Sequence, residues 1–293
     1  MNTPRLHHVP CLDTQGLHRV AYWEWGDPAN PRVLVCVHGL TRQGRDFDVL
    51  AAAMCDRYRV VCPDIAGRGE SDWLANAMEY SIPRYVADMV TVLARVNAET
   101  VHWVGTSMGG LIGMGVAALA SGASPSPIGR LVLNDVGPVL EPKAIARIGA
   151  YLGLPMRWDS VEQAADYLLT ISKGFGPHTR DQWLALTRPM LRSVEGGGVH
   201  LHYDPAMAAP FKVATPEMAA AGEVALWRAY DAITCPTLLL RGADSDLLTA
   251  DTAQAMSGRG PRAQLHRFDG VGHAPTLVSA DQVRVVREFL LAE

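Results

Sequence analysis

Short apolar runs alternate with amphipathic segments along most of this chain. The run 33–37 is rich in β-branched residues and has no polar position, as expected of a strand buried on both faces of a sheet. Comparable runs predict strands at 59–62, 101–104, 130–135, 236–241 and 263–268, and helical spacing of apolar residues predicts helices at 46–57, 85–96, 111–120, 249–256 and 281–291. This alternation predicts an α/β fold with a mostly parallel central sheet and helices on both faces.

The pattern changes between residues 139 and 229. This stretch has no buried β-branched run, and amphipathic helical segments at 144–151, 161–172 and 180–191 are separated by glycine-rich turns. We therefore expect a core that begins over 1–138, an inserted helical segment over 139–229, and a return to the core over 230–293. A chain of 293 residues is long enough to bury one large core with such an insertion.

Composition excludes several classes of function. The 26 basic and 30 acidic residues give a net charge of −4 without any basic block, so nucleic acid is not an expected partner. The first ten residues lack the apolar core of a signal peptide and no 18-residue apolar run follows, so we expect a soluble, cytoplasmic protein with no membrane partner. No nucleotide-binding glycine motif follows a strand, and we expect no cofactor.

The most informative motif surrounds Ser107. An apolar strand pattern ends in Gly105-Thr106-Ser107-Met108-Gly109, and a small-residue helix pattern follows at once. A serine on such a strand-to-helix turn presents its hydroxyl outside the backbone and beside a helix N-terminus, which favours developing negative charge. In this context Ser107 is predicted to be a nucleophile rather than a helix cap.

Other reactive side chains follow other predicted strands. In open parallel sheets the functional loops lie at the carboxyl ends of strands, where this chain carries His38-Gly39-Leu40, Asp244 with Asp246, and His273. A serine hydroxyl needs a base within hydrogen-bond reach, and that base needs a carboxylate to orient it. We predict that His273 is the base and that the backbone N–H groups of Leu40 and Met108 hold the oxyanion.

Taken together, five motifs make the chain resemble the cap-bearing α/β-hydrolases, a group of carboxylesterases, lactonases and C–C bond hydrolases. They are His38-Gly39, Asp64-x-x-Gly67-x-Gly69-x-Ser71, Gly105-x-Ser107-x-Gly109-Gly110, Ser245-Asp246 and Gly272-His273. The resemblance covers nearly the whole predicted core and implies that residues 139–229 form a cap over the active site. The family pattern favours Asp246 as the acid, with Asp244 and Asp135 as alternatives.

The predicted function is a serine hydrolase that cleaves a small to medium carboxylic ester or lactone through an acyl-enzyme. The triad Ser107, His273 and Asp246 would also serve a C–C hydrolase of vinylogous diketones, an acyltransferase or a slow-turnover receptor. Ala274 and Pro275 follow Gly272-His273, where C–C hydrolases usually carry an aromatic residue, and this favours ester or lactone cleavage. Neither the oligomeric state nor the substrate follows from the sequence.

Several polar residues have simpler interpretations. His38 is expected to hold the backbone of the oxyanion loop, and Asp64, Arg68, Ser71 and Asp72 to form a structural, salt-bridged turn. The segment His200-x-His202-Tyr203-Asp204 has a spacing that could bind a metal, but no third ligand cluster is evident, and we expect no metal site.

Overall fold

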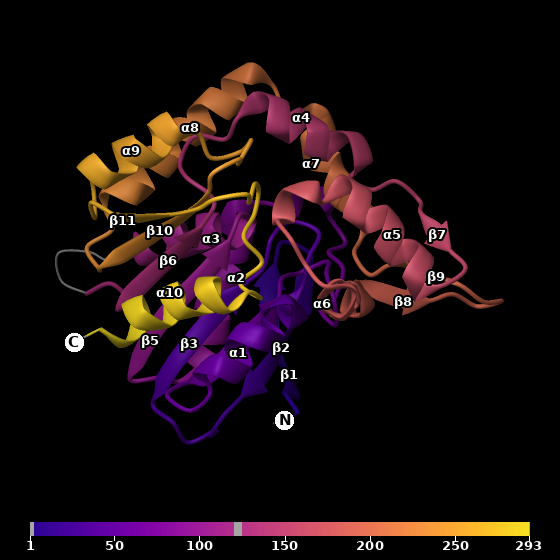
Figure 1. Ribbon diagram of the computed structural model, residues 1–293, viewed down its shortest axis with the longest axis horizontal. Helices are drawn as coiled ribbons and strands as arrows, with labels where there is room; N and C mark the ends of the chain where they lie inside the picture. The colour runs from indigo at the N-terminus through magenta and orange to yellow at the C-terminus, as the bar shows by residue number, and fades with distance from the viewer. Residues whose placement is uncertain (1–2, 120–124, 293) are drawn as a thin grey trace.

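A mostly parallel sheet runs through the middle of the molecule, in a computed structural model that describes residues 3–119 and 125–292. Within these residues eight strands pair in the order β1-β2-β4-β3-β5-β6-β10-β11 (Figure 1). All neighbours from β4 to β11 are parallel, while β2 pairs antiparallel with β4 and with β1. The strands are β1 (Arg5–Asp13), β2 (Gly16–Trp25), β3 (Arg32–Val37), β4 (Arg59–Asp64), β5 (Thr100–Thr106), β6 (Arg130–Asn134), β10 (Thr237–Gly242) and β11 (Gln264–Phe268).

Helices cover both faces of this sheet, as the apolar runs predicted. Alternate residues of β3 show why: Val33 and Val35 lie in one apolar cluster with α2 and α3, whereas Leu34 and Cys36 lie in a second cluster with α1 and α10. The predicted α/β fold class is confirmed. The helices of the core are α1 (Asp48–Met54), α2 (Ile82–Val96), α3 (Met108–Ala117), α9 (Ala250–Gly258) and α10 (Ala280–Leu291).

The insertion between β6 and β10 contains most of the remaining helices and also a small sheet. The strands β7, β9 and β8 pair antiparallel, so the insertion adds a small sheet to the expected helices. These strands are only two or three residues long, too short to leave an alternating pattern in the sequence. The insertion comprises α4 (Pro142–Tyr151), β7 (Arg157–Trp158), α5 (Val161–Ile171), α6 (Arg180–Thr187), β8 (Leu191–Ser193), β9 (Val199–Leu201), α7 (Ala209–Val213) and α8 (Pro216–Asp231).

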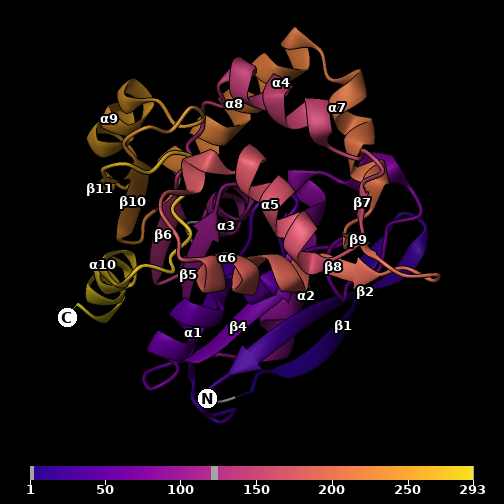
Figure 2. The ribbon, with the colours of Figure 1, turned by 45° about the vertical axis from the view of Figure 1, so that its right-hand side comes forward.

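The inserted helices and strands gather on one side of the core (Figures 1 and 2). Backbone hydrogen bonds tie them to loops that follow core strands: Gly69 N–H donates to His202 O, Asp204 N–H donates to Gly67 O, and Gly272 N–H donates to Gly174 O. The insertion therefore touches the loops after β4 and β11. The division into 1–138, 139–229 and 230–293 stays a prediction.

Two parts of the fold were not expected from the sequence. The hairpin of β1 and β2 left no clear pattern in the sequence, because β1 lies at the sheet edge and most of its side chains are exposed. Helix α8 buries only Tyr230 among its residues, so it has no long apolar stripe. The end of the helix predicted over 111–120 and the start of the loop after it, at 120–124, lie outside the described residues.

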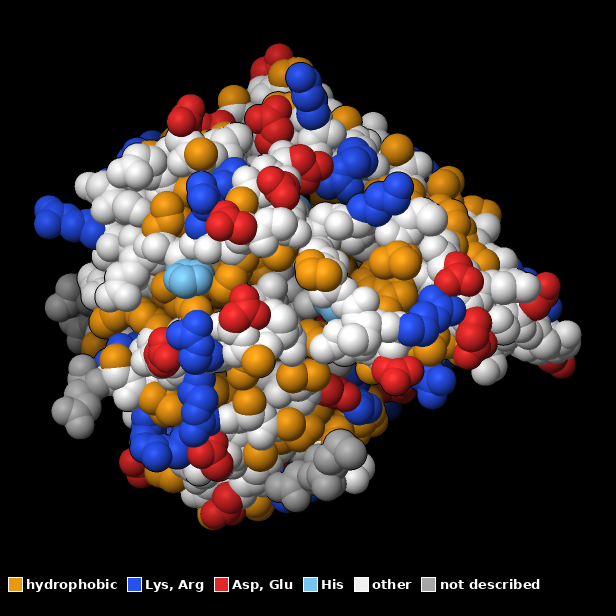
Figure 3. Space-filling model, in the orientation of Figure 1, with side chains coloured by type: hydrophobic (Ala, Val, Ile, Leu, Met, Phe, Trp, Pro, Cys, Tyr) orange, Lys and Arg blue, Asp and Glu red, His pale blue; other side chains and the backbone are white. Residues whose placement is uncertain are grey.

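Figure 3 shows acidic and basic side chains on the same face of the molecule, with a group of Lys and Arg side chains at its lower left. Among the described residues, none of the helices is both long and apolar enough to cross a bilayer.

Candidate active site

Ser107 occupies a strained turn between β5 and α3. Its backbone angles are φ 52° and ψ −117°, a conformation that costs a non-glycine residue free energy and is concentrated at functional sites. The flanking glycines make the turn possible. A Cβ at Gly105 would collide with the carbonyl oxygen of Gly109, and a Cβ at Gly109 would collide with that of Val37.

The structure brings Ser107 and His273 together with a carboxylate. The Oγ of Ser107 lies 3.0 Å from His273 Nε2, and His273 Nδ1 lies 2.8 Å from an oxygen of Asp135. Asp135 is fully buried and also accepts hydrogen bonds from Gly242 N–H at 2.8 Å and Ser245 Oγ at 2.6 Å. A carboxylate that only accepts suits its ionised form. It holds the imidazole proton on Nδ1, which leaves Nε2 to accept from Ser107.

The acid predicted from the sequence, Asp246, is not the one that contacts His273. Its side chain is half exposed and forms an ion pair with Arg147 of α4 at 2.8 Å. Asp244 is exposed as well. The residue between them, Ser245, turns inward and donates to Asp135. The expected acid is therefore corrected from Asp246 to Asp135, the earlier strand end that the sequence left open.

Asp135 is well placed because of the order of the strands. It directly follows β6, which lies between β5, the strand before Ser107, and β10. Its own N–H donates to Leu240 O of β10, at 2.9 Å, so its backbone is tied to the sheet. The sequence signal that could have selected it is a carboxylate at the end of a buried strand next to the one that carries the serine.

The loop after β3 passes beside Ser107. A Cβ added to Gly39 would lie 3.7 Å from Ser107 Cβ. His38 holds this loop as expected: Nδ1–H donates to Gly39 O at 2.7 Å, and Nε2 accepts from Ile65 N–H at 2.9 Å. Burial lowers the pKa of His38 to about 3, and the charges of Arg68 and Arg42 act in the same direction. The ring is therefore neutral near pH 7.

The two predicted oxyanion donors keep their amides unused. Met108 is the first residue of α3, so its N–H has no partner within the helix. Among the described residues, neither this N–H nor that of Leu40 donates a hydrogen bond. Backbone N–H groups without a protein partner are the donors that an oxyanion site requires.

The insertion clasps the loop that carries His273. Gly174 O accepts from Gly272 N–H at 2.6 Å, and His178 Nε2 lies 2.7 Å from Thr276 Oγ1. From the core side, Asn134 Nδ2–H donates to Pro275 O at 2.7 Å. The imidazole is thus placed by contacts from both parts of the molecule.

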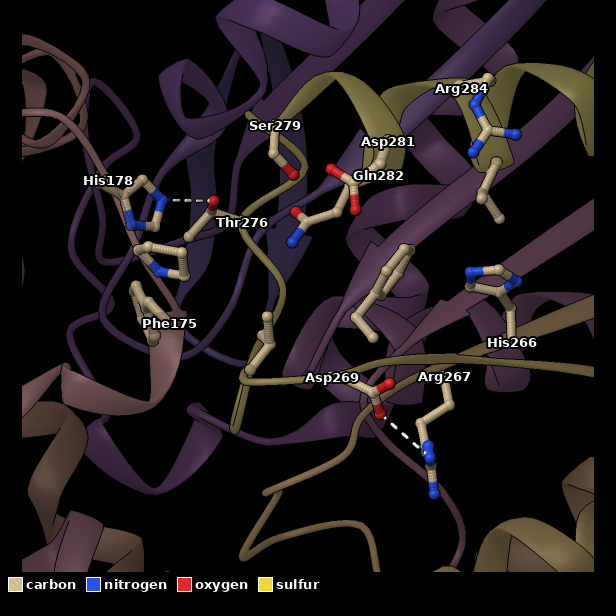
Figure 4. Close-up of a pocket in the computed structure, with 14 residues that line it drawn as sticks. Phe175, His178, His266, Arg267, Asp269, Thr276, Ser279, Asp281, Gln282 and Arg284 are labelled. Carbon is tan, nitrogen blue, oxygen red and sulfur yellow. Dashed lines mark hydrogen bonds and ion pairs between the residues drawn. The ribbon is translucent and has the colours of Figure 1, made fainter.

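A cavity of about 400 Å³ lies between the insertion, β11 and the start of α10 (Figure 4). Phe175 and His178 of the insertion face the start of α10 across it, and Arg267 pairs with Asp269 at its edge. Neither Ser107 nor His273 lines this cavity. It is therefore not assigned as the substrate-binding site.

One buried cluster has side chains of types that bind metal ions. Possible ligand atoms of Cys11, His18 and Asp88 lie within 4.8 Å of one another, between the β1–β2 hairpin and α2. His18 lies 3.1 Å from Asp88 and 3.3 Å from Asp13, and the hydrogen bond to Asp88 raises the pKa of the imidazole against the effect of burial. The His18 imidazole between the carboxylates of Asp13 and Asp88 accounts for this cluster without a metal ion. His200 and His202 join no such group among the residues described.

The turn at 64–72 has a structural role but differs from expectation in one residue. Asp64 accepts from Gly44 N–H and Glu70 N–H, and Asp72 pairs with Arg19 at 2.9 Å. Arg68 lies fully buried and has no carboxylate within 4.0 Å among the described residues. The expected salt-bridged turn is therefore wrong for Arg68.

Comparisons with known proteins agree with this geometry. Residues 34–288 match the family model described as the alpha/beta hydrolase family. The chain belongs to this family. It is 56% identical over 98% of both chains to a 3-hydroxybutyrate-oligomer hydrolase of Cupriavidus necator. It is therefore an ester hydrolase, which confirms the predicted reaction class.

Solved structures of hydrolases superimpose on nearly the whole chain. An alpha/beta hydrolase from Novosphingobium aromaticivorans is 34% identical, with a TM-score of 0.84 and 99% of both chains covered. A putative hydrolase from Rickettsia typhi is 28% identical, with a TM-score of 0.87 over 99% of both chains. The fold, including the insertion, is thus shared over the full length with family members.

Proposed function

We propose that this protein hydrolyses the ester bonds of short 3-hydroxybutyrate oligomers, with Ser107 as nucleophile, His273 as base and Asp135 as the acid that orients it. The observation that carries the substrate is the 56% identity over 98% of both chains to a hydrolase of these oligomers. The contacts of Ser107 with His273 and of His273 with Asp135 support the assignment of roles.

The first half of the reaction forms an acyl-enzyme. Ser107 Oγ adds to the ester carbonyl carbon while its proton moves to His273 Nε2, and the carbonyl electron pair goes to the oxygen held by Leu40 and Met108 N–H. Collapse of this intermediate breaks the bond to the secondary 3-oxygen of the next unit. That oxygen leaves as a hydroxyl with the proton from His273.

Water completes the cycle in the same site. The water oxygen attacks the acyl carbon while His273 Nε2 takes a proton from the water. His273 then returns a proton to Ser107 Oγ as the bond between Oγ and the acyl carbon breaks and the 3-hydroxy acid leaves. Asp135 stays ionised throughout and stabilises the imidazolium that forms twice in each cycle.

Product analysis with a linear 3-hydroxybutyrate trimer tests the proposal. We expect release of dimer and monomer, measured by chromatography, with the Ser107→Ala variant slower by about 10⁴-fold or more. A p-nitrophenyl ester of butyrate serves as a general esterase substrate for comparison. Equal rates for wild type and Ser107→Ala would overturn the proposed role of Ser107. Cleavage of the p-nitrophenyl ester without any cleavage of the trimer would overturn the proposed substrate.

A further inference from the structure

Arg68 is a buried cation whose nearest partners are all neutral. Its side chain is 0% exposed, in the turn after β4. Its Nε–H donates to Leu40 O at 2.8 Å, and its Nη1–H donates to Ala66 O at 2.6 Å and to Tyr85 Oη at 2.8 Å. The guanidinium carbon lies 5.0 Å from the centre of the Tyr85 ring.

No carboxylate neutralises this charge directly. Within residues 3–119 and 125–292, every ion pair of 4.0 Å or less involves other residues. Asp204 is connected to Arg68 through Tyr80: it accepts from the Tyr80 hydroxyl at 2.6 Å, and the Tyr80 ring centre lies 5.8 Å from the guanidinium carbon. Burying an unpaired charge is unfavourable, so a fold that keeps one calls for a compensating role.

The position of this charge suggests that role. Arg68 holds the carbonyl of Leu40, and its Nη2 lies 3.4 Å from Met108 Sδ. Leu40 and Met108 are the two residues proposed to donate their N–H groups to the oxyanion. The guanidinium therefore contacts both residues of the proposed oxyanion site.

The insertion shields the same turn from water. Gly69 N–H donates to His202 O at 3.2 Å, and Asp204 N–H donates to Gly67 O at 2.8 Å. The turn that carries Arg68 is therefore covered by backbone from the inserted segment. A charge that is kept away from water acts more strongly on its surroundings than an exposed one.

We propose that Arg68 is a positioning residue of the oxyanion site, where its unpaired guanidinium holds Leu40 in place and adds positive potential that stabilises the tetrahedral intermediate. This inference rests on the proposed function, because it takes Leu40 and Met108 N–H as the oxyanion donors. Its effect is on the transition state rather than on substrate binding, since the guanidinium reaches the site through Leu40 and Met108.

Two substitutions separate charge from hydrogen bonding. Arg68→Gln keeps donors but removes the charge, and Arg68→Lys keeps the charge but loses the fork that holds Leu40 and Ala66. We expect Arg68→Gln to lower kcat by about tenfold to a hundredfold with KM changed by less than about threefold, and Arg68→Lys to lose less. Tyr85→Phe removes one hydrogen bond to the guanidinium, leaves its charge, and is expected to stay near wild type.

Inhibition supplies a readout that a purely structural role would not change. A trifluoromethyl ketone with a butyryl-length chain adds to the serine and forms an oxyanion, whereas the matching methyl carbinol binds without one. In Arg68→Gln we expect the inhibition constant of the fluoroketone to rise by the same factor as kcat falls, with the carbinol unaffected. Equal losses for both compounds, or equal kcat losses in the Lys and Gln variants, would overturn the proposal.

Folding and the proposed function are checked in the same experiment. Each variant is compared by thermal unfolding, and if Arg68→Gln does not fold, Arg68→Lys decides. In Arg68→Lys, a loss of kcat with weaker fluoroketone binding and unchanged carbinol binding supports the proposal, whereas an unchanged kcat rejects the positioning of Leu40 by the guanidinium and equal weakening of both compounds rejects the proposal as a whole. Ser107→Ala separates the two hypotheses: activity there refutes the proposed function, whereas an inactive Ser107→Ala with a fully active Arg68→Gln refutes only the role of Arg68.

Discussion

At the scale of single residues, the buried carboxylate of Asp135 and the exposed carboxylate of Asp246 have different partners. Asp135 accepts from His273, from Gly242 at the end of β10 and from Ser245 in the loop after it, and its side chain is out of contact with water. Asp246 forms an ion pair with Arg147, and both side chains are exposed to solvent. Only the buried residue can act on the imidazole in a medium where charges interact strongly.

Asparagine substitutions at these two positions should give very different results. Asp135→Asn removes the charge and lets the imidazole adopt the wrong tautomer, so we expect kcat to fall by about 10⁴-fold. Asp246→Asn breaks only an exposed ion pair, so we expect a stability loss of at most about 1 kcal/mol and nearly unchanged kcat. Steady-state kinetics and urea unfolding of both variants provide the measurement. The reverse ranking of the two kcat values would restore Asp246 as the acid.

At the scale of elements, the insertion supports the site as well as covering it. The 3₁₀ turn Lys173–Phe175 lies against the loop of His273, and Gly174 is its point of closest approach. A Cβ at Gly174 would lie 3.2 Å from His273 N and 3.3 Å from His273 O. The backbone of His273 thus limits the size of residue 174.

We therefore expect Gly174→Ala to displace the imidazole by a few tenths of an ångström from Ser107. Misplacement of a base lowers the rate steeply, and a fall in kcat of about tenfold to a hundredfold is expected, with KM little changed. The measurement is kcat and KM on the same oligomer or ester substrate.

Gly149→Ala is a matched control for this variant. Gly149 lies in α4 of the same insertion, and a Cβ there meets nothing within 4 Å. We expect unchanged kcat and a gain in stability of about 1 kcal/mol, because alanine favours helix. If both alanine variants kept full activity, contact with Gly174 would not position His273.

At the scale of the whole molecule, two buried neutral histidines make the fold sensitive to acid. Burial lowers the pKa of His38 to about 3 and that of His102 to about 4. His102 on β5 lies 2.9 Å from the hydroxyl of Tyr58, which donates in turn to Leu290 O of α10. Protonation of His102 in acid would therefore place a charge beside the hydrogen bonds that connect β5, Tyr58 and α10.

The sign of the pH effect follows from where the proton is bound. Below about pH 6.5 the unfolded chain protonates these histidines and the native protein does not, so their contribution to stability is complete above that pH. It is lost as the pH falls toward about 4, by up to about 1.4 kcal/mol per pH unit for each histidine. Asp64, whose pKa burial raises to about 6, changes stability in the opposite direction.

A difference between variants isolates the histidine effect. His102→Asn keeps a donor for Tyr58 but cannot gain a proton, so its free energy of unfolding should fall less steeply with acid than that of the wild type. Urea unfolding between about pH 4.5 and 7.5 measures the slope. His8→Asn changes an exposed histidine of β1 and should keep the wild-type slope. Parallel curves for wild type and His102→Asn would rule out this role of His102.

Local patterns were enough to predict the parallel sheet, its covering helices, the turn of Ser107 and the loop of His273. Continuous apolar runs such as 33–37 require burial on both faces, and the glycines beside Ser107 leave room only for a tight turn. Strand burial and the tight turn depend only on residues close together in the chain, so the sequence alone is enough to predict them.

Only the tertiary structure decided which acid contacts His273, that Arg68 has no counter-ion among the described residues, and where the insertion contacts the core. Each depends on which strand lies next to which and on how a loop turns, since Asp135 and His273 are 138 residues apart in the chain. Two aspartates after two neighbouring strands are alike as sequence. Burial of Asp135 by Gly242 and Ser245, set by strand order, is the physical difference between them.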